Sequence, residues 1–197
     1  MEVAVLSQIV AFVLGTVAGV VGCWVFWRAL LAVRPKVKFA ELAAFCETSK
    51  CLGVKVANLG RHQVTDIEAR MAVADRTQEG RIITRIVGKL NAPTLLAFEP
   101  LAKLNEPWLL PTVFVFVAIN GEEMVRCLGD QLQGGGDRRL LFTLSMRDGL
   151  SGTKIVKRAI FSSEQVRSGW YDHALFFQII PDMIYEPSIE TNYVTII

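Results

Sequence analysis

Metal-binding side chains are scarce in this sequence. Its 197 residues include four cysteines and two histidines. A structural zinc site usually takes four such ligands, grouped in closely spaced pairs. Cys46 and Cys51 could form one pair, but only His62 and His173 are left to supply a second. We therefore expect no metal site and no cofactor.

A large excess of charge is also missing. The 21 Lys and Arg residues nearly balance the 19 Asp and Glu residues, which leaves a net charge of +2. Nucleic-acid binding relies on a strong positive field, so nucleic acid is not an expected partner. Asp172 and His173 are adjacent, but no nucleophile or glycine-rich loop accompanies them. Because catalysis needs several groups in mutual geometry, we do not expect an enzyme.

The sequence does contain one long uncharged run. Val3 to Trp27 carries no charged residue, which is about 25 residues against the roughly 20 that a membrane-spanning helix needs. The run is too long for the apolar part of a signal peptide, and Glu2 stands where a signal peptide has basic residues. We expect residues 1–33 to form a retained transmembrane helix with its ends.

Basic residues follow this run on its C-terminal side only. They are Arg28, Arg34, Lys36 and Lys38. Positive residues favour the cytoplasmic side, so we predict a single-pass protein of the plasma (inner) membrane with its N-terminus outside. Pro35 ends the helix, so residues 34–38 are expected to be a basic linker before a cytoplasmic domain over residues 39–197.

The four basic residues are also candidate ligands for anionic membrane lipids. At the depth of the head groups, each Lys or Arg gains about 1 kcal/mol near an anionic surface. The alternative is that they act only as a topology signal.

Small residues recur at every fourth position of the expected helix. They are Ala11, Gly15, Gly19 and Cys23. Such a stripe lets helices approach closely, and we expect it to favour self-association. The alternative is that glycine and alanine are simply common in membrane helices.

After Pro35 the apolar residues alternate with a period of two. Strands are predicted over residues 37–39, 43–45, 52–56, 64–73, 81–87, 112–119, 140–146, 155–161, 174–180 and 193–197. Asn120-Gly121 predicts a hairpin turn, and Ser162 to Glu164 a helical turn. Cys46 and Cys51 flank a turn and are candidate cross-strand neighbours, expected to be thiols in a reducing compartment. Short strands between turn signals predict an antiparallel all-β sandwich.

The order of these motifs resembles that of the inward-rectifier potassium channels, the prokaryotic members above all. Arg34-Pro35-Lys36 is similar to the junction where their inner helix enters the cytoplasmic domain. Other similar segments follow in the same order: residues 38–40, 52–61, 67–70, 76–80, 115–122, 158–170 and 185–194. The resemblance implies an immunoglobulin-like β-sandwich, assembly as a homotetramer, and sensing of anionic lipid at the junction.

The sequence departs from that family at the pore. These channels have two membrane helices and a re-entrant loop with a Thr-x-Gly-Tyr/Phe-Gly filter, and no such motif occurs here. We interpret the chain as an inner helix with a cytoplasmic gating domain, channel-like or regulatory, without its own potassium filter. Two alternatives remain open: a non-conducting, membrane-anchored module that binds a cytoplasmic ligand or partner, and an accessory subunit of a channel that supplies the pore.

Overall fold

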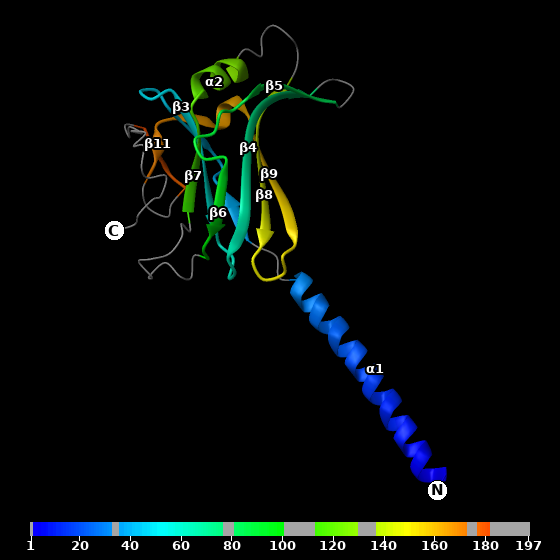
Figure 1. Ribbon diagram of the computed structural model, residues 1–197. Coiled ribbons are helices and arrows are strands. Elements are labelled where there is room, and N and C mark those ends of the chain that lie inside the picture. The colour runs from blue at the N-terminus through cyan, green and yellow to red at the C-terminus, as the bar shows by residue number, and fades with distance from the viewer. Residues whose placement is uncertain are drawn as a thin grey trace. The chain divides into compact units, whose positions relative to one another are not determined.

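The computed structural model describes residues 2–32, 36–76, 81–100, 113–129, 137–172 and 177–181. The chain divides into two compact units, Met1–Arg34 and Pro35–Ile197. The described residues of the first unit form one helix, and those of the second form a β-rich domain (Figure 1).

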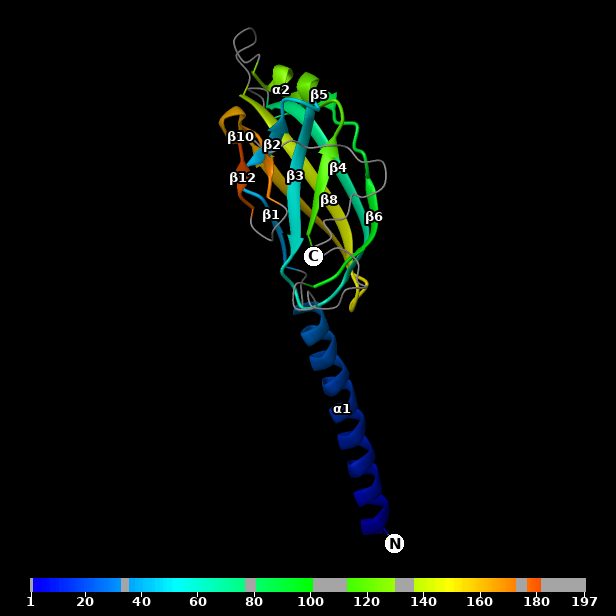
Figure 2. The same ribbon diagram turned by 90° about the vertical axis from the view of Figure 1, so that its left-hand side faces the viewer.

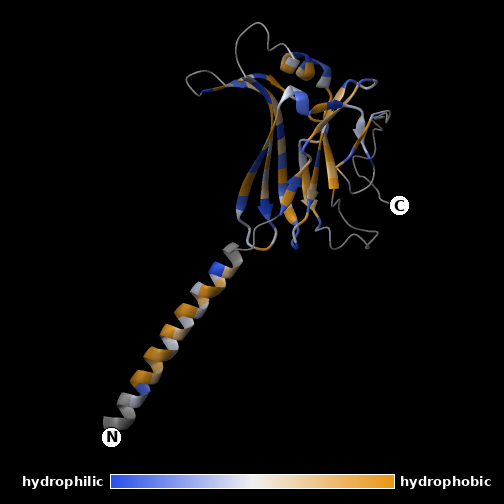
Figure 3. Cartoon of the chain, turned by 180° about the vertical axis from the view of Figure 1, so that it is seen from behind, coloured by the Kyte–Doolittle hydropathy of each residue, from blue (hydrophilic) through white to orange (hydrophobic). Residues whose placement is uncertain are grey.

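Helix α1 (Glu2–Ala32) is the predicted apolar helix. Its segment Ser7–Ala29, 23 residues long, is long and apolar enough to cross a membrane. Figure 3 shows hydrophobic residues along most of its length. The hydroxyl of Thr16 donates to the carbonyl of Phe12 at 2.9 Å, so this polar group is satisfied within the helix, as is usual for threonine in membrane helices.

The described residues of the β-rich domain form two five-stranded sheets and a small two-stranded one. The first sheet consists of β1 (Val37–Phe39), β2 (Ala43–Cys46), β3 (Cys51–Asn58), β7 (Val113–Ala118) and β10 (Val166–Ser168). The second consists of β4 (Val64–Arg76), β5 (Ile82–Val87), β6 (Thr94–Phe98), β8 (Asp137–Asp148) and β9 (Lys154–Phe161). The third pairs β11 (Trp170–Tyr171) with β12 (Ile179–Ile180).

Each large sheet is built around one long strand. In the first sheet, β3 pairs with β7 on one side, and with both β2 and β1 on the other. The edge strand β10 joins β2 in parallel. In the second sheet, β4 pairs with β8 on one side and with β5 and β6 on the other, and β9 follows β8. Figure 2 shows the first sheet in front of the second.

The main core lies between these two sheets. Ile67, Ala69 and Met71 of β4 are buried in it, as their alternation with polar residues predicts. The first sheet contributes Phe114 and Phe116, whose ring centroids lie 4.8 Å apart in an edge-to-face arrangement. Alternating apolar residues from both sheets thus meet in one layer, which is the packing expected of a sandwich.

The helix α2 (Gly121–Gly129) corrects one prediction. Asn120-Gly121 was expected to form a hairpin turn, but Gly121 begins this helix. Met124 and Leu128 lie one helical turn apart and are both buried in the main core. A Cβ at Gly121 would lie 2.3 Å from the amide nitrogen of Leu52, so glycine allows the helix to begin directly against β3.

The other strand predictions hold for most of the described residues. The helical turn at Ser162 is confirmed as the 3-10 helix η3 (Ser163–Gln165). Strands β6, β10 and β11 were missed, and β1 begins at Val37, inside the expected linker. The predicted strand 193–197 and most of the predicted strand 174–180 lie outside the described residues.

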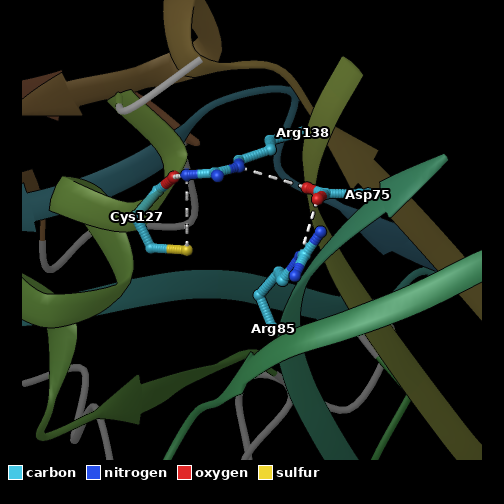
Figure 4. Close-up of polar contacts among 4 residues, drawn as sticks. All are labelled: Asp75, Arg85, Cys127 and Arg138. Atoms are coloured by element: carbon cyan, nitrogen blue, oxygen red, sulfur yellow. Dashed lines mark hydrogen bonds and ion pairs between the residues drawn. The ribbon is translucent and has the colours of Figure 1, made fainter. Parts of the chain in front are cut away.

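A charged cluster joins three strands of the second sheet (Figure 4). Buried Asp75 on β4 accepts a hydrogen bond from Nε of Arg85 at 2.7 Å, and its Oδ1 lies 3.2 Å from Nε of Arg138. Arg138 on β8 also donates from Nη1 to the carbonyl of Cys127 in α2 at 2.8 Å. The cluster therefore connects α2 with the strands β4, β5 and β8.

Replacing Asp75 with Asn should destabilise the fold. The change leaves the largely buried guanidinium of Arg138 without a counter-charge, and breaking a buried ion pair in this way costs roughly 3 kcal/mol. The free energy of unfolding of the full chain in detergent, from a denaturant titration, measures the loss. The control is Glu68→Gln, which breaks the exposed Glu68–Arg70 pair, 2.7 Å long, and should change stability only slightly. Equal losses in the two variants would contradict the buried role of Asp75.

Candidate functional site

Strand β3 is buried along all eight of its residues, Cys51–Asn58. Alternate side chains point to opposite faces of a sheet. Val54 and Val56 face the main core between the two large sheets. Cys51, Gly53 and Lys55 point to the opposite face of the first sheet, which a two-layer sandwich would leave to solvent.

A segment near the C-terminus covers this second face. Its buried residues are Trp170 and Tyr171 of β11, and Phe177 and Ile179 are partly buried against them. They pack on Ala40, Ala44, Cys46, Cys51 and Val117 of the first sheet. We call residues 170–172 and 177–180 the cover. The first sheet is therefore buried on both faces, with a small second core beneath the cover.

Two contacts fix the cover on the first sheet. A Cβ at Gly53 would lie 2.6 Å from Cη2 of Trp170, so the indole ring lies directly on the backbone of β3 because residue 53 has no side chain. The hydroxyl of Tyr171 donates to the carbonyl of Leu42. Burial raises the pKa of Tyr171, so the phenol stays protonated and able to donate.

Lys55 lies beneath the cover with none of its surface exposed. Its Nζ donates to the carbonyl of Asp172 at 2.7 Å and lies 5.8 Å from the ring centroid of Tyr171. Burial lowers the pKa of Lys55 to about 8, and the negative charge of Asp172 opposes this shift. Such a lysine is partly neutral slightly above physiological pH.

Lys55 was not among the residues singled out from the sequence. The signal was present, because Lys55 is the one charged residue in β3 and its neighbours from Cys51 to Ala57 are apolar or small on both faces of the strand. A strand that is apolar at both parities is buried on both faces. A single lysine in such a strand is therefore a candidate for a buried charge.

Three of the four candidate lipid ligands lie in the described residues. Arg28 is exposed on α1, with Cζ 5.2 Å from the ring centroid of Trp24. Lys36 and Lys38 are exposed at the start of the β-rich domain, and Nζ of Lys38 lies 5.4 Å from the ring centroid of Phe177 in the cover. Arg34 lies outside the described residues. Lipid binding by these side chains remains a prediction.

The small-residue stripe lies on the exposed surface of α1. Its members are Ala11, Gly15, Gly19 and Cys23. A Cβ added at Gly15 or Gly19 would meet no other atom within 4 Å. The stripe is therefore open to a neighbouring helix, and its role in self-association remains a prediction.

Several other polar residues make contacts that stabilise local structure. Asn58 donates from Nδ2 to the carbonyl of His62 at 2.9 Å, which closes the turn after β3. Glu68 and Arg70 form an exposed ion pair. His173 lies outside the described residues. Among the described residues, no group of three or more His, Cys, Asp or Glu side chains could hold a metal ion.

Comparison with known proteins gives little. No protein-family model and no curated protein matches the sequence. Among solved structures, the X-ray structure of Northeast Structural Genomics Consortium target SoR45 matches at 14% identity, over 66% of this chain and 84% of that one, with a TM-score of 0.29. A likeness this weak assigns neither a fold family nor a function.

Replacing Lys55 with Met should change how stability depends on pH. Between pH 8 and 10.5 the unfolded chain carries a proton on Lys55 that the folded chain has largely lost. Stability therefore rises with pH through this interval, and the full penalty for burying the charge is present below pH 8. Relative to wild type, Lys55→Met should be most stable at or below pH 8 and should lose this advantage by pH 10.5.

The measurement is the difference in unfolding free energy between variant and wild type, by denaturant titration at several pH values. Subtracting wild type removes the titration of all other groups. The control is Leu96→Met, at an exposed position without a titratable group, where the difference should not change with pH. A difference for Lys55→Met that also stays constant would contradict the shifted pKa.

Proposed function

We propose that this chain is the membrane-anchored gating half of a channel-like or regulatory assembly. In this proposal α1 is an inner-type helix, and the β-rich domain is an immunoglobulin-like sandwich of the inward-rectifier class, in the cytoplasm. One observation carries the proposal. The helix α1 exposes large apolar side chains on all sides, among them Phe12 and Val20, which are 76% and 65% exposed. Only lipid or other apolar helices can cover such a surface.

The positions of the family-like motifs support this proposal. The Arg34-Pro35 junction coincides with the boundary between the two compact units. The motif over residues 52–61 occupies β3 and the turn after it, and the motif at residues 67–70 lies in β4. The motif over residues 158–170 runs from β9 through η3 to the start of β11. These segments therefore occupy structural elements of the domain or its boundary, while residues 77–80 and 185–194 of two further motifs lie outside the described residues.

The proposed partners are further copies of the chain and anionic lipids. The open stripe at Gly15 and Gly19 gives α1 a face on which helices can pack closely, consistent with a homo-oligomer, which we propose to be a tetramer. The exposed Lys36 and Lys38 lie at the start of the domain, a few residues after α1. If α1 spans the membrane, these side chains can reach anionic lipid head groups.

Any pore that these helices formed would be hydrophobic. Apart from Ser7, Gln8 and Thr16, the uncharged run offers few polar groups, and the Thr16 hydroxyl is bonded within its own helix. A narrow apolar constriction opens and closes by wetting and dewetting. We therefore propose gating without a potassium filter.

The second candidate is a non-conducting anchor for a domain that binds a ligand or partner, or for an accessory subunit. The even distribution of apolar side chains around α1 is equally compatible with this candidate, because it marks no particular face of the helix as pore-lining. In this case α1 only holds the domain at the membrane, or packs against a partner that supplies the pore.

Ion flux separates the two candidates. The purified full chain is placed in liposomes, with and without anionic lipid, and potassium and sodium flux is measured. The proposal expects flux that increases with anionic lipid and falls when Arg34, Lys36 and Lys38 are replaced by Gln. A control variant with Arg126, Lys154 and Arg158 replaced by Gln removes the same charge elsewhere and should behave like wild type. Absence of flux from a confirmed oligomer would establish the non-conducting candidate instead.

The Gly15→Leu and Gly19→Leu double variant tests the helix stripe. Two leucines would keep the helices apart, so cross-linking in detergent or bilayer should show a smaller oligomer or a weaker one. Replacing Val13 and Val17 with Leu is the matched control, since these positions lie off the stripe. An unchanged oligomer in the glycine variant would mean that the β-rich domain drives assembly alone.

A further inference from the structure

We propose that Cys46 and Cys51 form a site of reversible disulfide formation, shielded by the cover. The inference is independent of the channel-like function. It rests on the register of one hairpin and on the residues that bury it.

The register places the two cysteines directly opposite each other. In the antiparallel pairing of β2 with β3, Cys46 and Cys51 are Cα partners. Directly opposed residues have Cα atoms about 4.5 or 5.5 Å apart and point to the same face of the sheet. A disulfide tolerates Cα separations of about 4.4–6.8 Å, so both ladder spacings allow the bond without moving the strands.

Both residues are thiols in this structure, and both are buried in the same small core. Burial raises the pKa of Cys51, and the neighbouring Cys46 raises it further. That influence is consistent with two sulfur atoms close to each other. The thiolate is the reactive form, so the folded site reacts slowly until one thiol is exposed.

The turn between the cysteines is constrained. Lys50 has a φ of 56°, in the left-handed region that glycine favours. Its carbonyl accepts a hydrogen bond from the amide of Glu122 at 3.1 Å, and its side chain lies 3.6 Å from that of Glu122. The Sγ of Cys51 lies 3.2 Å from the carbonyl of Ser49. These contacts keep the two ends of the hairpin in register, so the thiols stay paired when the face above them is uncovered.

The cover controls access. Cys46 and Cys51 are 2% and 4% exposed, and Trp170 and Tyr171 lie in the same cluster. A small oxidant therefore reaches the thiols only when the cover lifts from the first sheet. The extent of disulfide formation would then depend on how often the cover lifts from the first sheet.

The chemistry needs one co-reactant, a small-molecule disulfide such as oxidised glutathione. One cysteine thiolate attacks it, which forms a mixed disulfide and releases one small thiol. The second thiolate then attacks the protein sulfur of the mixed disulfide, closes the Cys46–Cys51 bond and releases the second small thiol. The protein loses two hydrogens in total, and the co-reactant is reduced to two thiols.

Peptide mapping of the folded full chain in detergent tests the site. The chain is incubated with oxidised and reduced glutathione, alkylated and digested with trypsin. Cleavage after Lys50 separates the two cysteines, so a disulfide appears as two peptides joined through Cys46 and Cys51 that dithiothreitol releases. A Cys23→Ser, Cys127→Ser variant keeps only the proposed pair and should give the same product. Complete alkylation of both cysteines under oxidising conditions would overturn the proposal.

The rate of disulfide formation tests whether the cover shields the thiols. Trp170→Phe loosens the contact with Gly53 and should speed disulfide formation several-fold, while Trp24→Phe on α1 should leave the rate unchanged. Circular dichroism checks that each variant stays folded. If Trp170→Phe is unstable, alkylation of wild type by reagents of increasing size replaces it, with slower reaction of larger reagents expected. A rate that depends neither on Trp170 nor on reagent size would show that the cover does not shield the thiols.

Discussion

Strand β3 is buried on both faces, and the other parts of the domain pack around it. On one face Val54 and Val56 pack in the main core, opposite the residues of β4 and β8. On the other face Gly53 and Lys55 lie beneath the cover. Backbone groups in so buried a strand must all be paired, and β1, β2 and β7 supply the partners on its two edges. The first sheet is thus the middle layer of the domain.

The two units differ in how much of their apolar surface is buried. The domain buries many of its large apolar side chains in two cores of its own, although others such as Leu96 and Val156 stay exposed. The helix leaves nearly all of its large apolar side chains exposed: even Trp24 and Trp27 are each 59% exposed. A surface of this kind lowers its free energy only in lipid or against other apolar helices. The proposed membrane role follows from the exposed apolar surface of the helix.

The local features were predictable and the long-range ones were not. The uncharged run predicts α1, and the alternation around Ile67 and Met71 predicts the buried face of β4. Helix α2 was missed because Asn120-Gly121 has the composition of a turn, while its helical state depends on the fit of Gly121 against β3. The cover and the environment of Lys55 depend on Trp170 and Asp172, over a hundred positions away. No local pattern encodes the contact between Lys55 and Asp172. The sequence indicates only that Lys55 is a single charged residue in a strand with apolar or small residues on both faces.

The same separation sets an order of events during synthesis. The amine of Lys55 and its acceptor, the carbonyl of Asp172, are 117 positions apart, and the edge strand β10 pairs with Ala43–Phe45 from a similar distance. At about 5–20 residues per second, the ribosome releases β3 several seconds before the cover exists. Until then the outer face of β2 and β3, which carries Lys55 and the Cys46–Cys51 pair, is open to water and to other chains. During synthesis, chaperones can therefore bind a surface that is buried in the finished domain.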